Sequence, residues 1–176
     1  MTTIASDGLK RYIRDIPDFP KPGILFRDIT PLLQNGPVLH GVIEQLAQRY
    51  LPQRIDAVVA VESRGLIFGA PLAYRLQAGL IPVRKAGKLP AETIRAEYTL
   101  EYGSGSLEIH ADSLAQGMRV VLVDDLLATG GTMGAVVDLM ERMKVQVIEL
   151  AFLVELNELN GRSRLGAHPI VSLVQY

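Results

Sequence analysis

The sequence predicts an α/β fold with a central parallel sheet of about five strands flanked by helices. Short apolar runs rich in β-branched residues recur along the chain, and polar turns and helix-like segments separate them. This alternation is typical of consecutive strand–helix–strand units. The chain has 176 residues, of which 48% are hydrophobic and 21% are charged. These values predict one globular domain over residues 1–176.

The elements follow from the spacing of apolar residues. Buried-strand patterns occur at residues 57–61, 80–83, 120–123, 145–154 and 170–174. Helical spacing occurs at residues 6–16, 37–50, 66–76 and 132–143. Three prolines predict a loop over residues 17–23, and residues 25–27 are expected to be extended.

Residues 85–112 interrupt this alternation of strands and helices. Hairpin arms are expected at residues 98–102 and 107–110, joined by a turn at the Gly-Ser-Gly-Ser stretch of residues 103–106. An excursion of this length in a compact domain often covers a binding site. We therefore expect residues 85–112 to form a flexible lid.

Charge and composition exclude several function classes. The formal net charge is -1, so no basic surface field favours nucleic acid. The absence of cysteine excludes disulfides and thiol catalysis, and the three histidines lack metal-ligand spacing. No apolar run approaches the ~20 residues of a membrane span, and no signal peptide is visible. We expect a cytoplasmic protein that binds neither nucleic acid nor membranes.

The most informative motif follows the run of residues 120–123. Asp124 and Asp125 come at the end of this strand, and a short loop leads to Gly130-Gly131-Thr132 at the start of a helix. Unpaired N–H groups at a helix N-terminus bind phosphate, and glycines let the backbone approach it. The two carboxylates suit the hydroxyl groups of a ribose, or Mg²⁺ at one remove.

This thirteen-residue pattern resembles the phosphoribosyl pyrophosphate motif of the type I phosphoribosyltransferases. The resemblance extends almost end to end, to the adenine-specific branch of the family. It covers the motifs at residues 18–23, 25–28, 62–65, 84–90, 100–103 and 153–156. It implies the type I fold, with residues 1–36 as a base-binding cap and the hairpin as a lid. The implied reaction converts adenine and phosphoribosyl pyrophosphate into AMP and pyrophosphate, with Mg²⁺, in purine salvage.

The resemblance also assigns the donor-binding residues. It places the ribose 5-phosphate on Asp124, Asp125, Ala128, Thr129, Gly130, Gly131 and Thr132. It assigns pyrophosphate binding and the closing lid to a second set of residues: Glu62, Ser63, Arg64, Gly65, Arg84, Lys85, Lys88 and Tyr102. It also suggests a non-proline cis bond in the turn at residues 62–65. The family uses an arginine at the position of Arg84 to reach the partner subunit's site, which implies a homodimer. Mg²⁺ would be held mainly through the donor, with the two aspartates nearby.

Glu101 is the candidate acid/base, with Arg64 as a second catalytic residue. Adenine reacts through N9, and a carboxylic acid beside N7 can supply a proton when burial raises its pKa. The family places a glutamate in the Leu-Glu-Tyr-Gly motif that contains Glu101. Enzymes for 6-oxopurines carry an aspartate where this chain has Ala128, which favours adenine and again points to Glu101.

The resemblance places the adenine pocket at Leu25, Phe26, Arg27 and Leu159. Phe26 can stack on a flat base, and the backbone of its two neighbours can read the 6-amino group and N1. Two alternatives stay open. One is the same fold acting on another base, and the other is a non-catalytic sensor of phosphoribosyl pyrophosphate.

Overall fold

The computed structural model describes residues 6–100 and 103–176. Its main sheet has seven strands in the order β5-β6-β4-β3-β7-β8-β9. The five parallel strands are β4 (Gly79–Lys85), β3 (Ala57–Val61), β7 (Arg119–Leu127), β8 (Gln146–Glu155) and β9 (Ile170–Gln175). Each corresponds to one of the five predicted strands, so the prediction of about five parallel strands is confirmed. The other two strands, β5 (Thr93–Leu100) and β6 (Gly103–His110), extend the sheet as an antiparallel hairpin.

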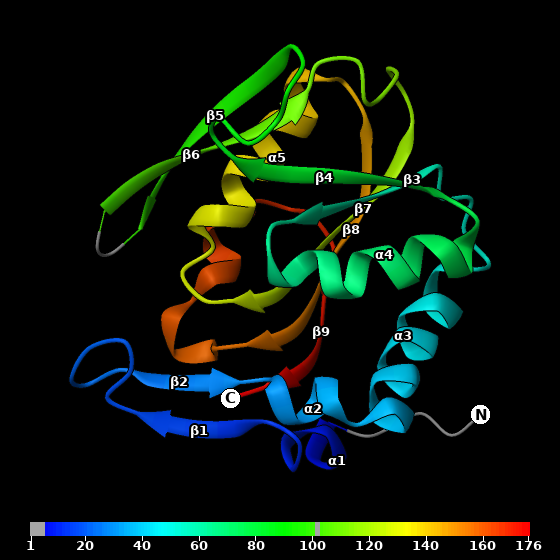
Figure 1. Cartoon of the computed structure of the whole chain (residues 1–176). Helices are drawn as coiled ribbons and strands as arrows, with labels where there is room; N and C mark the ends of the chain where they lie inside the picture. The colour runs from blue at the N-terminus through cyan, green and yellow to red at the C-terminus, as the bar shows by residue number, and fades with distance from the viewer. Residues whose placement is uncertain (1–5, 101–102) are drawn as a thin grey trace.

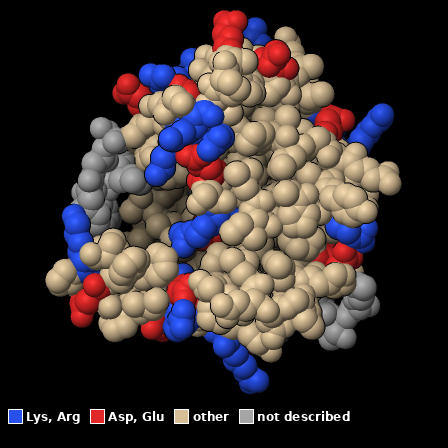
Figure 2. Space-filling model, in the orientation of Figure 1, with Lys and Arg blue, Asp and Glu red and all other residues tan. Residues whose placement is uncertain are grey.

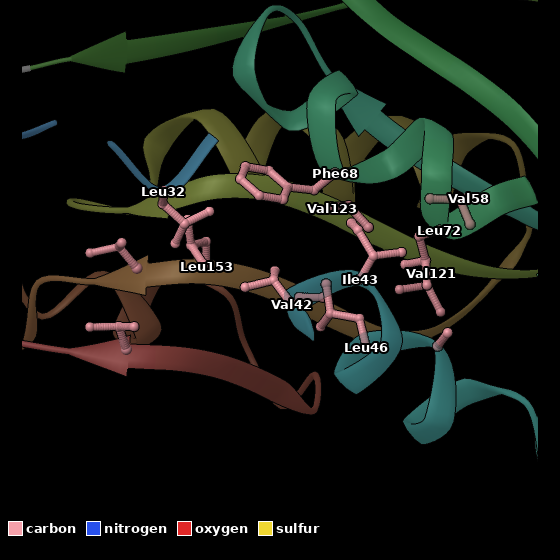
Figure 3. Close-up of a cluster of buried hydrophobic side chains, with 14 of the residues drawn as sticks. Leu32, Val42, Ile43, Leu46, Val58, Phe68, Leu72, Val121, Val123 and Leu153 are labelled. Atoms are coloured by element: carbon pink, nitrogen blue, oxygen red, sulfur yellow. The ribbon is translucent and has the colours of Figure 1, made fainter. Parts of the chain in front are cut away.

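Helices cover both faces of the parallel sheet (Figure 1). Helices α3 (Gly36–Tyr50) and α4 (Arg64–Leu76) lie on one face and pack on Val58, Val121 and Val123 (Figure 3). Helix α5 (Gly131–Arg142) covers the other face, where Val59 and Leu122 are buried. Side chains alternate between the two faces of a strand, so one continuous apolar run supplies both cores. Among the described helices, none has both the length and the apolar character needed to cross a membrane.

The helix predicted over residues 6–16 is wrong in its second half. Helix α1 (Ser6–Lys10) is short, and the chain then enters strand β1 (Arg14–Pro17). This strand pairs with β2 (Leu25–Asp28) in a separate antiparallel ribbon. Ion pairs across the ribbon join Arg14 to Asp28 and Asp15 to Arg27. These long-range partners outweigh the local helical spacing of the apolar residues.

The end of the ribbon is fixed by Asp28. Its carboxylate accepts hydrogen bonds from the Thr30 side chain and backbone and from Arg14, and these contacts lower the pKa of Asp28 to about 2. The short helix α2 (Thr30–Gln34) starts there, and the sequence analysis did not predict it. Between the two strands, the Phe19–Pro20 bond is cis, within the predicted loop.

The hairpin turn predicted at residues 103–106 is also wrong. These residues belong to β6, where Ser106 pairs with Glu97 and Gly105 pairs with Tyr98. A Cβ at position 105 would lie 2.7 Å from the Tyr98 ring, so this glycine leaves room for the aromatic ring across the hairpin. The predicted arm residues 101 and 102 lie outside the described residues. Toward the other end of the hairpin, Leu107 and Ile109 are buried in the core beneath α5.

A buried carboxylate joins helix α3 to strand β8. Glu149 is 5% exposed, and it accepts a hydrogen bond from the Tyr50 hydroxyl at 2.7 Å and from Arg49 Nη2 at 2.6 Å. Burial and the neighbouring carboxylate raise the pKa of Tyr50. The hydroxyl therefore remains a donor at neutral pH, and the contact stabilises the fold.

We predict that Tyr50→Phe lowers the free energy of unfolding by about 1–2 kcal/mol, because Glu149 loses a buried donor. Denaturant titration measures the change. Tyr74→Phe is the matched control, since Tyr74 is 84% exposed. This variant should change the free energy of unfolding by no more than about 0.5 kcal/mol. Equal unfolding curves for the two variants would contradict the prediction.

Candidate active site

The predicted phosphate loop lies between β7 and α5. Strand β7 is longer than predicted and continues through Asp124 and Asp125 to Leu127. Helix α5 then starts at Gly131, and Gly130 before it has a left-handed backbone with φ of 80°. Residues 124–133 and Arg64 line a cavity of about 170 Å³. The first N–H groups of α5 are at this cavity, which suits an anion the size of a phosphate.

The two aspartates are close to each other and to Arg64. Asp125 is buried, and its Oδ2 lies 3.0 Å from Arg64 Nε. Its backbone N–H donates to Asp124 Oδ1 at 2.9 Å. Burial and the Asp125 charge raise the pKa of Asp124 well above its ordinary value. Burial also raises the pKa of Asp125, although Arg64 opposes the rise. Two adjacent carboxylates with raised pKa values form a site that favours cations or hydroxyl donors.

The second predicted anion turn packs directly on the first. The Glu62–Ser63 bond is cis, as the resemblance suggested, and Arg64 is the first residue of α4. A Cβ on Gly65 would lie 2.8 Å from the Val123 carbonyl oxygen and 2.9 Å from Asp124 Oδ1. Only glycine permits this approach, which brings the start of α4 against the end of β7.

A second cavity, of about 430 Å³, lies between these turns and the hairpin. Its lining includes Glu62, Ser63, Arg64, Lys85, Tyr98, Leu107, Asp124, Asp125 and Thr132. The hollow in Figure 2 lies on the same side of the molecule, between the β5–β6 hairpin and the β1–β2 ribbon. The structure therefore brings residues of both predicted anion turns to one cavity.

Glu62 contacts two of the predicted cationic residues. Its carboxylate accepts from Arg84 Nε at 2.6 Å and from the Lys85 backbone N–H at 3.0 Å. Arg84 also donates to the Lys88 carbonyl oxygen at 3.1 Å. Desolvation opposes ionisation of Glu62, but Arg84 and the Lys85 amide lower its pKa overall. The carboxylate is thus a partner of the cations, and Arg84 and Lys88 are joined within one loop.

The predicted base-pocket residues line a third cavity, also of about 430 Å³. Leu25, Phe26, Arg27 and Leu159 lie around it, together with Ala128 and Thr129 of the phosphate loop. The Phe26 and Phe19 rings meet edge-on, with their centres 5.2 Å apart. The Arg64 guanidinium lies 5.4 Å from the centre of the Phe26 ring. Leu25 is 44% exposed and Leu159 is 37% exposed, so apolar surface is available to a flat ligand.

Two predicted residues cannot be placed. Glu101 and Tyr102 lie outside the described residues, and their roles stay predictions. Tyr98, on the strand leading toward them, lines the cavity between the anion turns.

The oxygen ligands at this site fit an Mg²⁺ ion that the protein and a substrate hold together. Among residues 6–100 and 103–176, no group of three or more possible metal ligands occurs. The adjacent carboxylates of Asp124 and Asp125 supply hard oxygen atoms whose raised pKa values favour a nearby cation. Mg²⁺ is typically bound by one or two carboxylates plus substrate phosphates, so these residues suit it.

Comparisons with known proteins identify the family. The model of the phosphoribosyl transferase domain matches residues 28–171. A protein of Chloroflexus aurantiacus named adenine phosphoribosyltransferase is 58% identical over 168 residues, which is 96% of this chain and 97% of that protein. The chain belongs to the adenine phosphoribosyltransferase family.

Solved structures of the adenine phosphoribosyltransferase family share the fold. That of the Thermoanaerobacter pseudethanolicus enzyme has a TM-score of 0.93 at 51% identity, covering 98% of this chain and 100% of that one. That of the Saccharomyces cerevisiae enzyme, solved with adenine and an imino-altritol bisphosphate, has a TM-score of 0.90 at 39% identity. The match covers 96% of this chain and 98% of the yeast chain.

Sequence reasoning missed several residues that line or support the cavities of this family member. Tyr98, Leu156 and Glu158 line cavities but belong to no phosphate-binding motif. Tyr176 supports the base pocket indirectly, because the Arg27 guanidinium lies 3.7 Å from the centre of its ring. A contact between residues 27 and 176 has no local signal in the sequence.

We predict that Asp124→Asn raises Tm at pH 8 by about 2 °C or more. The raised pKa of Asp124 means that protonation favours the folded state. That stability is present below the ordinary aspartate pKa of about 4 and is lost as pH rises through the raised pKa. Asparagine has no such charge and can still accept the Asp125 N–H.

The gain should shrink as the pH is lowered toward 5, which thermal scans across pH would show. Asp138→Asn is the control, because Asp138 is exposed and lies on α5 away from the cavity. A gain for Asp124→Asn that is the same at every pH would contradict the electrostatic explanation.

Proposed function

We propose that the chain transfers the 5-phosphoribosyl group of phosphoribosyl pyrophosphate to N9 of adenine, releasing pyrophosphate and forming AMP. One observation carries the proposal: the two anion cavities and the apolar base pocket adjoin one another and share lining residues. Arg64 lines both anion cavities, while Ala128 and Thr129 line both the phosphate-loop cavity and the base pocket. The family to which the chain belongs acts as purine-salvage transferases, which supports the same reaction.

In this proposal the donor lies along the carboxyl ends of β3 and β7. The backbone N–H groups of residues 129–132 bind the 5′-phosphate, and Asp124 and Asp125 bind the ribose hydroxyl groups. Ser63, Arg64, Gly65 and Lys85 bind the pyrophosphate. Lys88 adds positive charge near it, and Arg84 does so across the dimer interface. Donors fixed in place before the reaction stabilise the charge that develops on a leaving group.

Mg²⁺ would be held mainly by the donor, with Asp124 and Asp125 nearby. When bound, the ion neutralises part of the pyrophosphate charge. Arg64 lies between the two sites, since it contacts Asp125 and also lines the pyrophosphate cavity. It can therefore attract the leaving group while it holds the aspartate in place.

Adenine would occupy the cavity between Phe26 and Leu159. The ring of Phe26 stacks on the base, and the backbone of Leu25 and Arg27 reads its 6-amino group and N1. The bond from N9 to C1′ forms as the bond from C1′ to pyrophosphate breaks. Glu101, beside N7, accepts the proton that the adenine ring loses as the bond at N9 forms. Ala128 leaves no acid in the phosphate loop for this task, which favours adenine over a 6-oxopurine.

Three further features belong to the proposal. Residues 1–36 act as the base-binding cap, and residues 85–112 act as the lid, with Tyr102 closing over the donor. Exclusion of water by the lid would protect the activated sugar from hydrolysis. We further propose a cytoplasmic homodimer, in which Arg84 faces the neighbouring subunit's site.

A panel of bases tests the function. The protein is incubated with Mg²⁺, phosphoribosyl pyrophosphate and one base at a time: adenine, hypoxanthine, guanine, xanthine or uracil. We expect nucleotide from adenine alone. Product from a 6-oxopurine would overturn the base assignment, while donor binding without product from any base would favour a non-catalytic sensor.

Glu101→Ala should lower turnover about 100-fold or more while donor affinity changes less than about twofold, because the acid/base acts on the adenine ring. Steady-state kinetics and donor titration separate the two effects. Glu97→Ala is the matched control, since Glu97 is an exposed glutamate on β5. Unchanged turnover in Glu101→Ala would remove this residue from the mechanism.

A further inference from the structure

The segment that follows strand β8 lines the base pocket and packs against the backbone of the phosphate loop. It comprises the 3-10 turns η1 (Asn157–Leu159) and η2 (Gly161–Arg164), with Asn160 between them. Leu159 lines the base pocket. Two residues later, Gly161 is buried against the phosphate loop. The same short segment therefore contacts the proposed sites of both substrates.

Gly161 and Gly130 bring two backbones into direct contact. A Cβ on Gly161 would lie under 3.0 Å from the Ala128 carbonyl oxygen, 2.9 Å from Leu127 Cδ1 and 3.1 Å from the Gly130 nitrogen. A Cβ on Gly130 would likewise lie under 3.0 Å from the Gly161 carbonyl oxygen. Real Cβ atoms almost never approach other atoms so closely, and the nearest neighbour of each glycine is a backbone oxygen, which cannot rotate away.

The two glycines are required for different reasons. Gly130 has a left-handed backbone, which alone favours glycine. Gly161 has no positive φ, so its backbone does not itself require glycine. The close approach to the phosphate loop is therefore what requires a glycine at position 161.

The segment is also anchored from behind, so it cannot move away from the loop easily. Arg162 donates to both oxygens of Glu155, at 2.6 and 2.7 Å, and Glu155 is 3% exposed. The Leu156 N–H donates to the Leu127 carbonyl oxygen at 2.9 Å. A shift of the phosphate loop must consequently move the segment, or break these contacts.

We propose that Gly161 is a positioning residue that couples the phosphate loop to the base pocket, so that each substrate strengthens the binding of the other. Occupation of the phosphate loop fixes the loop against Gly161, and this fixes Leu159 at the wall of the base pocket. Coupling of this kind is reciprocal and is typically worth about 5–150-fold in affinity. The inference rests on the proposed function.

Calorimetry measures the coupling, with ribose 5-phosphate as the probe of the phosphate loop. Adenine affinity is determined with and without saturating ribose 5-phosphate. In the unmodified protein we expect ribose 5-phosphate to raise adenine affinity about fivefold or more. In Gly161→Ala the ratio should fall to about one, because the added methyl group separates the segment from the loop.

Gly134→Ala is the matched control. It makes the same change on α5, where the added Cβ meets no atom closer than 3.9 Å, so the coupling ratio should be unchanged. Arg162→Lys is a second variant, which keeps the charge but loses the paired contact with Glu155, and its ratio should also fall. It keeps the test informative if Gly161→Ala does not fold.

The outcomes separate the inference from the proposed function. Failure of the unmodified protein to bind adenine both with and without ribose 5-phosphate would contradict the function itself. Adenine binding that ribose 5-phosphate does not strengthen would contradict the coupling alone. So would an unchanged ratio in a folded Gly161→Ala variant, or in Arg162→Lys where Gly161→Ala does not fold.

Discussion

The contact between Arg64 and Asp125 joins the parts of the candidate site. It spans the first residue of α4 and the carboxyl end of β7, which are adjacent because Gly65 leaves no side chain between them. The same guanidinium lies beside the Phe26 ring of the base pocket. Parallel strands place their carboxyl ends at one edge of the sheet, so residues far apart in sequence converge there. The two aspartates need positive or donor groups at this edge, and Arg64 contacts Asp125 at 3.0 Å.

The parallel core could be predicted because its signal is local. Residues 57–61 and 120–123 are buried on both faces, and such strands are continuous apolar runs. The ribbon at residues 14–17 and the strand at residues 103–106 could not be predicted in this way. Their conformation depends on partners across the ribbon or hairpin, Asp28 for the first and Tyr98 for the second. Long-range pairing overrode local spacing in the first case and turn-forming composition in the second.

The residues of the candidate site show the same difference between local signals and long-range contacts. The phosphate loop could be predicted because phosphate binding of this kind would depend on backbone and small residues in sequence order, as at Gly130 and Thr132. The supports of the pocket depend on tertiary contacts instead. Tyr176 contacts Arg27, which is far from it in sequence, and Gly161 contacts Gly130 of the phosphate loop, 31 positions earlier. A glycine required by a close approach resembles any turn glycine in the sequence, and only its neighbours reveal the reason.

We propose that one edge of the sheet binds phosphate, sugar and base together, and a crystal structure of the protein with AMP would test this. We expect the phosphate on the backbone N–H groups of residues 129–132, the ribose at Asp124 and Asp125, and the base beside Phe26 and Leu159. A phosphate bound at residues 62–65, or a base outside the pocket of Phe26, would contradict this arrangement.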